Sequence, residues 1–120
     1  MKIKSGDKLY VITRRDLAPG YQAVQSIHAA QTFAVRFPEI NGEWYNRSNY
    51  LALLSVTDEA ALKRLYCRAL KSKLNVCAFI EPDIGFKITA IAIEPSKRTR
   101  ELCKTLPLAL KYCRTIKRRK

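Results

Sequence analysis

The sequence predicts a single α/β domain in which a mixed four-stranded sheet packs between helices. Short runs of β-branched and aromatic residues alternate along the chain with segments whose apolar residues recur at helical spacing. The last two predicted strands, 75–80 and 88–93, are joined by a turn too short for a crossover helix, so they should be antiparallel. With 120 residues, the chain is long enough for one core and too short for two.

The first strand is predicted at 8–13, an apolar run typical of a buried strand. A helix at 20–37 should follow, because Pro19 is tolerated at a helix start and Gly20 accepts unusual backbone angles. Its buried face should carry the apolar residues spaced three or four apart. These are Ala23, Val24, Ile27, Ala30, Ala34 and Phe37.

The segment 39–49 is predicted to be a loop, because it contains an Asn41-Gly42 turn signal and further polar residues that bond their own backbone. Its Trp44 and Tyr45 have two interpretations. They can cover the sheet edge, or they can form a stacking surface for a base or sugar.

The second half of the chain continues the alternation. The apolar run 50–56 predicts a strand covered on both faces. A helix should begin at 57–59, where a hydroxyl and two carboxylates suit a helix N-terminus. After the two antiparallel strands, a third helix is predicted from Lys97 to about Thr105.

Four cysteines and one histidine bear on metal binding and compartment. The cysteines at 67, 77, 103 and 113 form no C-x-x-C pair, so no zinc site and no metal are expected. Reduced thiols indicate a cytoplasmic protein. The first residues lack an apolar secretion signal, and no apolar run is long enough to span a membrane.

The charge of the chain indicates a polyanionic partner. Its net charge is +13, from 23 Lys and Arg against 10 Asp and Glu. Nucleic acid is the first candidate and an acidic membrane surface the second, and we expect RNA and no membrane. A solvated helix face or a solubility or localisation tail would also explain part of this charge. The residues expected to contact RNA are Arg14, Arg15, Arg64, Arg68, Lys97, Arg98, Arg100, Lys117, Arg118, Arg119 and Lys120.

Two separated patches resemble the type 2 peptidyl-tRNA hydrolase family. Asp16-Leu17, Gly20, Ala23, Gln25 and His28-Ala29-Ala30 resemble its opening signature, D-L-x-M-G-K-G-K-x-A-A-Q-x-x-H-A. Asp83-x-Gly85 resembles its D-A-G-x-T turn, and 89–95 is similar to its T-x-L-A-I-G-P strand. The resemblance implies a hydrolase-like domain over 1–110. The Lys and Arg content of 111–120 predicts a basic tail after it.

The family cleaves the ester that joins a peptide to the 3′ ribose of tRNA, without a metal or organic cofactor, and is commonly dimeric. The resemblance therefore implies tRNA as partner, no cofactor and a possible homodimer. Carried over by position, it implies catalytic roles for Asp83, Thr89 and His28. The residues implied to bind substrate are Gly20, Tyr21, Gln22, Gln25 and Lys87.

The sequence departs from the family pattern at the two lysines after the first glycine. Here Gly20 is followed by Tyr21 and Gln22, so a neutral hydroxyl replaces a cation. Lys87 is a candidate to restore that cation from another direction. The alternative function is a catalytically inactive member of the fold that binds RNA or regulates.

The three candidate catalytic residues also have structural interpretations. A lone histidine in a helix, such as His28, often makes only a structural hydrogen bond. Asp83 follows a proline, where aspartate is a common turn residue. Thr89 lies in an apolar strand, where a hydroxyl commonly bonds the backbone.

Overall fold

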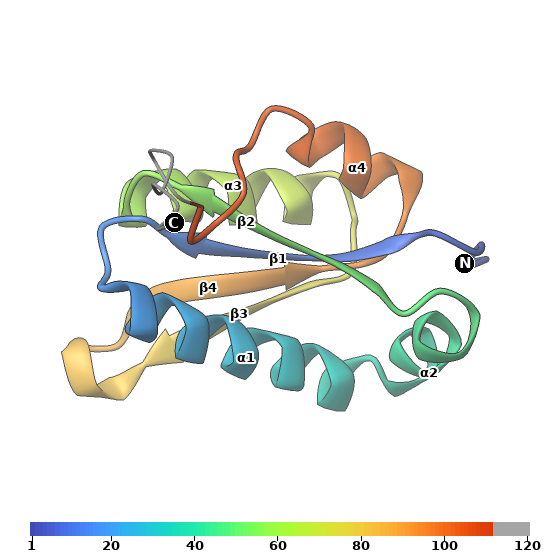
Figure 1. Ribbon diagram of the computed structural model, residues 1–120, viewed down its shortest axis with the longest axis horizontal. Coiled ribbons are helices and arrows are strands. Elements are labelled where there is room, and N and C mark those ends of the chain that lie inside the picture. Colours follow the sequence, from blue (N-terminus) through green and yellow to red (C-terminus); the bar gives the residue numbers. More distant parts are fainter. Residues whose placement is uncertain (112–120) are drawn as a thin grey trace, which may run out of the picture.

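The computed structural model describes residues 1–111, which form a four-stranded sheet in the order β2-β1-β4-β3 with helices on both faces (Figure 1). The predicted α/β architecture and mixed sheet are confirmed. The elements, in chain order, are β1 (Lys8–Arg14), α1 (Pro19–Arg36), α2 (Pro38–Arg47), β2 (Tyr50–Val56), α3 (Glu59–Lys71), β3 (Val76–Glu81), the 3₁₀ turn η1 (Pro82–Ile84), β4 (Lys87–Ile93) and α4 (Lys97–Cys103).

The sheet combines one parallel and two antiparallel pairings. Strand β1 runs parallel to β2, with Lys8 opposite Tyr50, and antiparallel to β4, with Val11 opposite Ala92. Strands β3 and β4 are antiparallel, as their short connection predicts, and their register shifts between Phe79 and Ile80. The carboxyl end of β1 therefore lies beside the amino end of β4.

Two apolar clusters fix the helices to the sheet. Figure 1 shows α1 and α2 on one face of the sheet and α3 and α4 on the other. Alternation along β1 sends Leu9 and Val11 toward Phe33 of α1, whereas Ile12 packs with Leu62 of α3. At ~25 cal/mol per Å² of buried apolar surface, such packing dominates the stability of the domain.

The segment predicted to be a loop at 39–49 is mostly the helix α2, so that prediction was wrong. Pro38 stands at the first helical position, where its missing N–H costs nothing. Trp44 is buried and its indole Nε1 donates to the Tyr50 carbonyl at 2.7 Å, so it covers the sheet edge. The Asn41-Gly42 pair therefore lies within a helix and forms no hairpin turn.

The buried face of α1 also differs from the prediction. Val24 and Ile27 are 49% and 61% exposed. The side chains turned inward are Gln22, Gln25, Ser26, Ala29 and Phe33. The first two turns of α1 therefore bring polar groups, instead of aliphatic ones, against the sheet. Buried amides and hydroxyls require hydrogen-bond partners. Gln22 donates to the loop before α1 and Ser26 to the Gln22 carbonyl, whereas the partners of Gln25 lie on β3 and β4.

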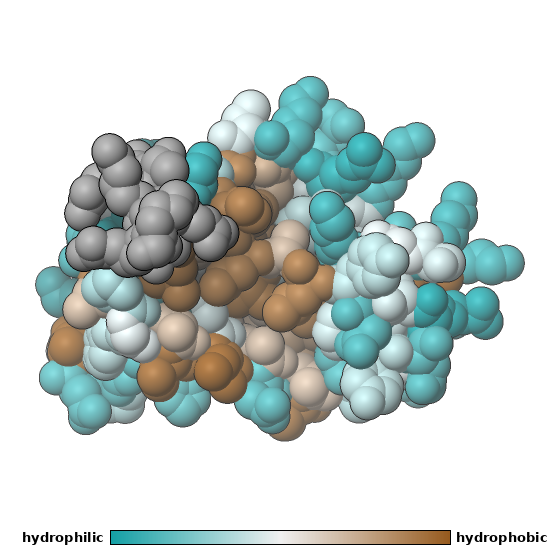
Figure 2. All heavy atoms as spheres, viewed as in Figure 1, coloured by the Kyte–Doolittle hydropathy of each residue, from teal (hydrophilic) through white to brown (hydrophobic). Residues whose placement is uncertain are grey.

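Strand β2 forms one edge of the sheet. The segment after α4 covers part of that edge, because Ser55 N donates to the Pro107 carbonyl and Ala109 N to the Leu53 carbonyl, each at 2.9 Å. The beginning of β2 stays open, with Tyr50 and Leu51 exposed. Figure 2, which has the same view as Figure 1, shows apolar side chains gathered across the middle of the molecular surface turned to the viewer. Within residues 1–111, no helix is both long and apolar enough to cross a lipid bilayer.

Candidate functional site

The start of α1 and the turn between β3 and β4 lie at the same end of the sheet (Figure 1). The first follows the carboxyl end of β1, and the second precedes the amino end of β4. Because β1 and β4 are antiparallel neighbours, these two ends are adjacent. The two sequence patches that carry the family resemblance therefore meet in space.

A buried hydrogen-bond chain joins the two patches. Gln25 of α1 donates from Nε2 to Oε1 of Glu81 at 2.8 Å, and its Oε1 accepts from the Thr89 hydroxyl at 2.7 Å. Gln25 is 1% exposed and Thr89 is fully buried. The Thr89 carbonyl in turn accepts from Thr13 of β1 at 3.0 Å. One glutamine thus links the first helix to β3 and β4.

Glu81, the last residue of β3, is the centre of this arrangement. Its Oε2 accepts from the backbone N–H of Asp83 at 3.2 Å. That N–H and then the Gln25 amide hold the pKa of the Glu81 carboxyl below its usual value. At neutral pH Glu81 is therefore a carboxylate that fixes the β3–β4 turn to α1.

Tyr21 lies beside the same carboxylate. Burial raises the pKa of the Tyr21 hydroxyl first, and the negative charges of Glu81 and Asp83 raise it further. The hydroxyl therefore stays protonated at neutral pH and can donate a hydrogen bond. The Tyr21 hydroxyl is therefore close enough to Glu81 and Asp83 for their negative charges to act on it.

A second contact holds the end of β1 to the start of β4. The Arg14 guanidinium donates to both carboxylate oxygens of Asp16, at 3.0 and 2.9 Å, and to the Ile88 carbonyl at 3.0 Å. The Arg14 hydrogen bonds lower the pKa of Asp16. Arg14 is 7% exposed, and these structural partners occupy its guanidinium, so the predicted role of Arg14 in RNA binding has little accessible surface to support it.

The three predicted catalytic residues occupy this region in different ways. Asp83 is exposed on the turn η1, which Gly85 closes in the left-handed conformation. His28 is exposed and its ring stacks on Phe79 with centroids 4.4 Å apart. Thr89 is inaccessible, so it can act only through Gln25. Among residues 1–111, no hydrogen bond joins any two of Asp83, His28 and Thr89.

The predicted substrate-binding residues divide between two sides of the α1 start. Lys87 is exposed at the first position of β4, opposite Glu81 in register, and Gly20 has free space where a side chain would begin. Gln22 donates to the Leu17 carbonyl at 2.7 Å, whereas its Oε1 is buried and has no partner among residues 1–111. Tyr21 and Gln25 take part in the Glu81 network described above.

Gln22 also lines a hollow of about 670 Å³ on the other side of the α1 start. The hollow has mainly apolar walls, to which Leu108 and Leu110 contribute, and two cations, Arg15 and Lys111. Apolar walls and positive charge suit a flat ligand that carries an anionic group.

The predicted RNA-binding cations are distributed over several surfaces. Arg64 and Arg68 are exposed on α3, and Arg98 donates to the Ser72 carbonyl. Lys97 and Arg100 line a separate pocket at the opposite end of β1. The predicted RNA contacts of the basic tail lie outside the described residues; they are Lys117, Arg118, Arg119 and Lys120.

Glu81 is the residue that sequence reasoning missed. It stands between Ile80 and Pro82 and matches no motif quoted for the family. The sequence carries no signal for it, because the apolar spacing of α1 predicts burial of the Val24 and Ile27 face and not of Gln25. Residues 1–111 bring together no group of three side chains able to hold a metal ion.

Comparisons with known proteins support the fold alone. No protein-family model matches the chain, and no curated protein matches it. Among solved structures, the chain is similar to a protein of unknown function, Atu0240, from Agrobacterium tumefaciens strain C58. The TM-score is 0.62 and the identity 18%, over 84% of this chain and 96% of that chain.

Proposed function

We propose that the protein hydrolyses the ester that joins an acyl or peptidyl group to the 3′ ribose of tRNA. One observation carries this proposal: Glu81 binds both the Gln25 amide and the Asp83 backbone N–H, which fixes the turn that carries the exposed Asp83 carboxylate beside the start of α1. The two motifs that resemble type 2 peptidyl-tRNA hydrolases supply Gln25 and Asp83. The net charge of +13 favours a nucleic-acid substrate.

In this mechanism, Asp83 acts on a water molecule. The Asp83 carboxylate takes a proton from water as the water oxygen bonds to the ester carbonyl carbon. The bond between that carbon and the ribose 3′ oxygen then breaks, and the proton passes to the 3′ oxygen. The products are a free carboxylic acid and a tRNA with a 3′ hydroxyl.

Other residues around the α1 start have supporting roles in the proposal. The Tyr21 hydroxyl donates to the oxygen that becomes negative in the transition state. Lys87 adds positive charge at the same turn. Arg15 and Lys111 bind phosphates near the RNA end, and the hollow beside Gln22 receives the terminal base.

A second candidate function is RNA binding without turnover. Within residues 1–111, no cation lies within 4 Å of the Asp83 carboxylate, and Thr89 is fully buried. The electrostatic help that a nearby lysine would give to ester hydrolysis is therefore weaker here. A basic domain with this site would still bind RNA through its phosphates.

Hydrolysis of N-acetyl-aminoacyl-tRNA, followed by release of free tRNA, distinguishes the two functions. We expect turnover by the natural protein and a loss of roughly 100-fold or more in D83N, because general-base catalysis contributes that much. D58N is the matched control: Asp58 is an exposed carboxylate that caps α3, and asparagine also caps helices. Tight, salt-sensitive binding without release in the natural protein would instead establish the binding function.

Lys87 provides a separate test of the charge near Asp83. K87A should lower turnover while leaving the unfolding midpoint unchanged, since the side chain is exposed. If K87A changed neither turnover nor tRNA binding, Lys87 would have no part in the site.

A further inference from the structure

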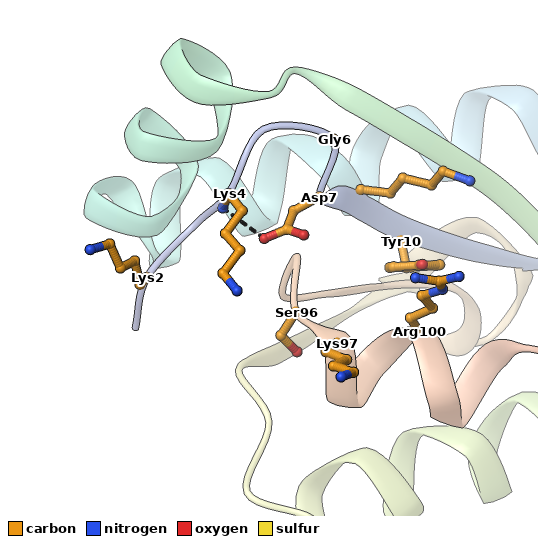
Figure 3. Close-up of a pocket in the computed structure, with 9 residues that line it drawn as sticks. Lys2, Lys4, Gly6, Asp7, Tyr10, Ser96, Lys97 and Arg100 are labelled. Atoms are coloured by element: carbon orange, nitrogen blue, oxygen red, sulfur yellow. Dashed lines mark hydrogen bonds between the residues drawn. The ribbon is translucent and has the colours of Figure 1, made fainter.

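A second, strongly basic pocket lies at the opposite end of β1 from the candidate site. It has a volume of about 560 Å³. Three segments line it: the first residues of the chain, the beginning of β1, and the beginning of α4 (Figure 3). Its charged residues are Lys2, Lys4, Lys8, Lys97 and Arg100, with one carboxylate, Asp7.

The positive charge of this pocket is not neutralised by the described part of the chain. None of the five cations forms an ion pair with a carboxylate of residues 1–111. Asp7 instead accepts from the backbone N–H of Lys4 at 2.8 Å, which closes a tight turn. Figure 3 shows the side chains of Lys4 and Lys97 reaching into the same space. Cations held close together in this way repel one another, so an anion between them is stabilised.

The pocket also contains an unused hydroxyl. Tyr10 is 7% exposed and lines the pocket, and its hydroxyl has no hydrogen-bond partner within residues 1–111. In Figure 3 the Arg100 side chain lies against the Tyr10 ring. The hydroxyl oxygen is not sealed from solvent by the described residues, so it can donate to a ligand oxygen that enters the pocket.

The frame that carries these groups is well packed. Ile3 is 1% exposed and anchors the first residues, while Ser96 caps α4 by accepting from Thr99 N at 3.2 Å. Lys8 and Tyr10 are held in β1 between β2 and β4. The backbone positions of the cations are therefore fixed by the fold, so a ligand need order only their side chains.

We propose that this pocket binds the phosphate groups of a nucleotide-sized ligand. Lysine and arginine are the side chains that bind phosphate most strongly, and five of them suit more than one phosphate group. The volume is within the range of about 300 to 1,000 Å³ typical of small-ligand sites. The phosphates can belong to a free nucleotide or to an RNA chain.

The pocket is separate from the candidate hydrolase site. Lys8 and Arg14 stand at the two ends of β1, about 20 Å apart at ~3.3 Å per residue. Substitutions in the pocket therefore leave the Gln25, Glu81 and Thr89 contacts in place. Phosphate binding here holds or fails independently of ester hydrolysis.

Calorimetric titration at 0.1 M salt with adenosine 5′-diphosphate, and separately with a single-stranded RNA hexamer lacking terminal phosphates, tests the proposal. For whichever probe binds the natural protein, the double variant K97Q/R100Q should weaken binding by roughly tenfold or more, because two phosphate-binding charges are lost. The control R64Q/K71Q removes the same charge from exposed positions on α3 and should change affinity less than about twofold.

The two probes identify the source of the phosphate. Binding of the diphosphate alone would assign the pocket to a free nucleotide, and binding of the hexamer alone would assign it to RNA. Y10F should weaken either by about threefold to tenfold without altering the unfolding midpoint, because one donated hydrogen bond is lost. The proposal is overturned if neither probe binds, or if both double variants weaken binding equally.

Discussion

Replacing Thr89 by valine tests the hydrogen-bond chain at the candidate site. The valine γ-methyl takes the place of the hydroxyl with almost no change in volume, so no cavity is created. What changes is the bond to Gln25, which is 2.7 Å long and fully buried.

The expected magnitude follows from the burial of both partners. A net contribution of about 1 kcal/mol is lost with the bond. The Gln25 Oε1 is then left without its donor in a residue that is 1% exposed, which costs ~1 to 2 kcal/mol more. T89V should therefore lower the free energy of unfolding by about 2 to 3 kcal/mol.

Thr32 offers a matched control, because T32V makes the same chemical change on α1. Its hydroxyl donates to the His28 carbonyl within the helix, at a site that is not fully buried. That variant should stay within about 0.5 kcal/mol of the natural protein. Urea unfolding monitored by circular dichroism measures both. If T89V and T32V unfold at the same urea concentration, the chain through Gln25 does not hold the site together.

Three further outcomes are expected. Because folding lowers the pKa of Glu81, its carboxylate should stabilise the folded protein fully above pH 4.5, and this stabilisation should be lost as the pH falls through the folded-state pKa. E81Q should therefore flatten the plot of unfolding free energy against pH in this acidic range. The same plot for E81Q and the natural protein would contradict this role of Glu81. Burial raises the pKa of the Cys77 and Cys103 thiols to about 11, so iodoacetamide should label exposed Cys67 before either of these two, as peptide mass mapping would show; equal rates at the three residues would refute this. W44F should cost about 2 kcal/mol in urea unfolding, because the indole bond to the Tyr50 carbonyl is lost, and a neutral result would mean that this bond does not stabilise α2.

The sheet could be predicted because its signal is local. Each strand is a short apolar run, and the connection between 80 and 88 is too short for any crossover, so the antiparallel pairing follows from chain geometry. The helix α2 was missed for the opposite reason. Its buried residue Trp44 bonds to Tyr50 in the next strand, a contact that the local Asn41-Gly42 signal does not reveal.

The inward face of α1 could not be predicted from spacing. Valine and isoleucine at 24 and 27 have the helical period, yet Gln25 is buried instead because its partners are 56 and 64 residues away. A periodicity argument assigns apolar residues to the core and has no means of finding a distant carboxylate. The family resemblance predicts that Gln25 and Asp83 lie at one site. The contacts of Glu81 with both residues are known only from the structure.

The most direct test of the proposed site is to locate a bound substrate analogue. A short RNA ending in CCA, with an aminoacyl group joined to its 3′ end by a stable amide, can be titrated into ¹⁵N-labelled protein and compared with the same RNA lacking that group. We expect the acyl group to add chemical-shift changes at the backbone amides of Tyr21, Asp83 and Lys87. Additional changes confined to Lys8, Tyr10 and the beginning of α4, or none at all, would contradict the account.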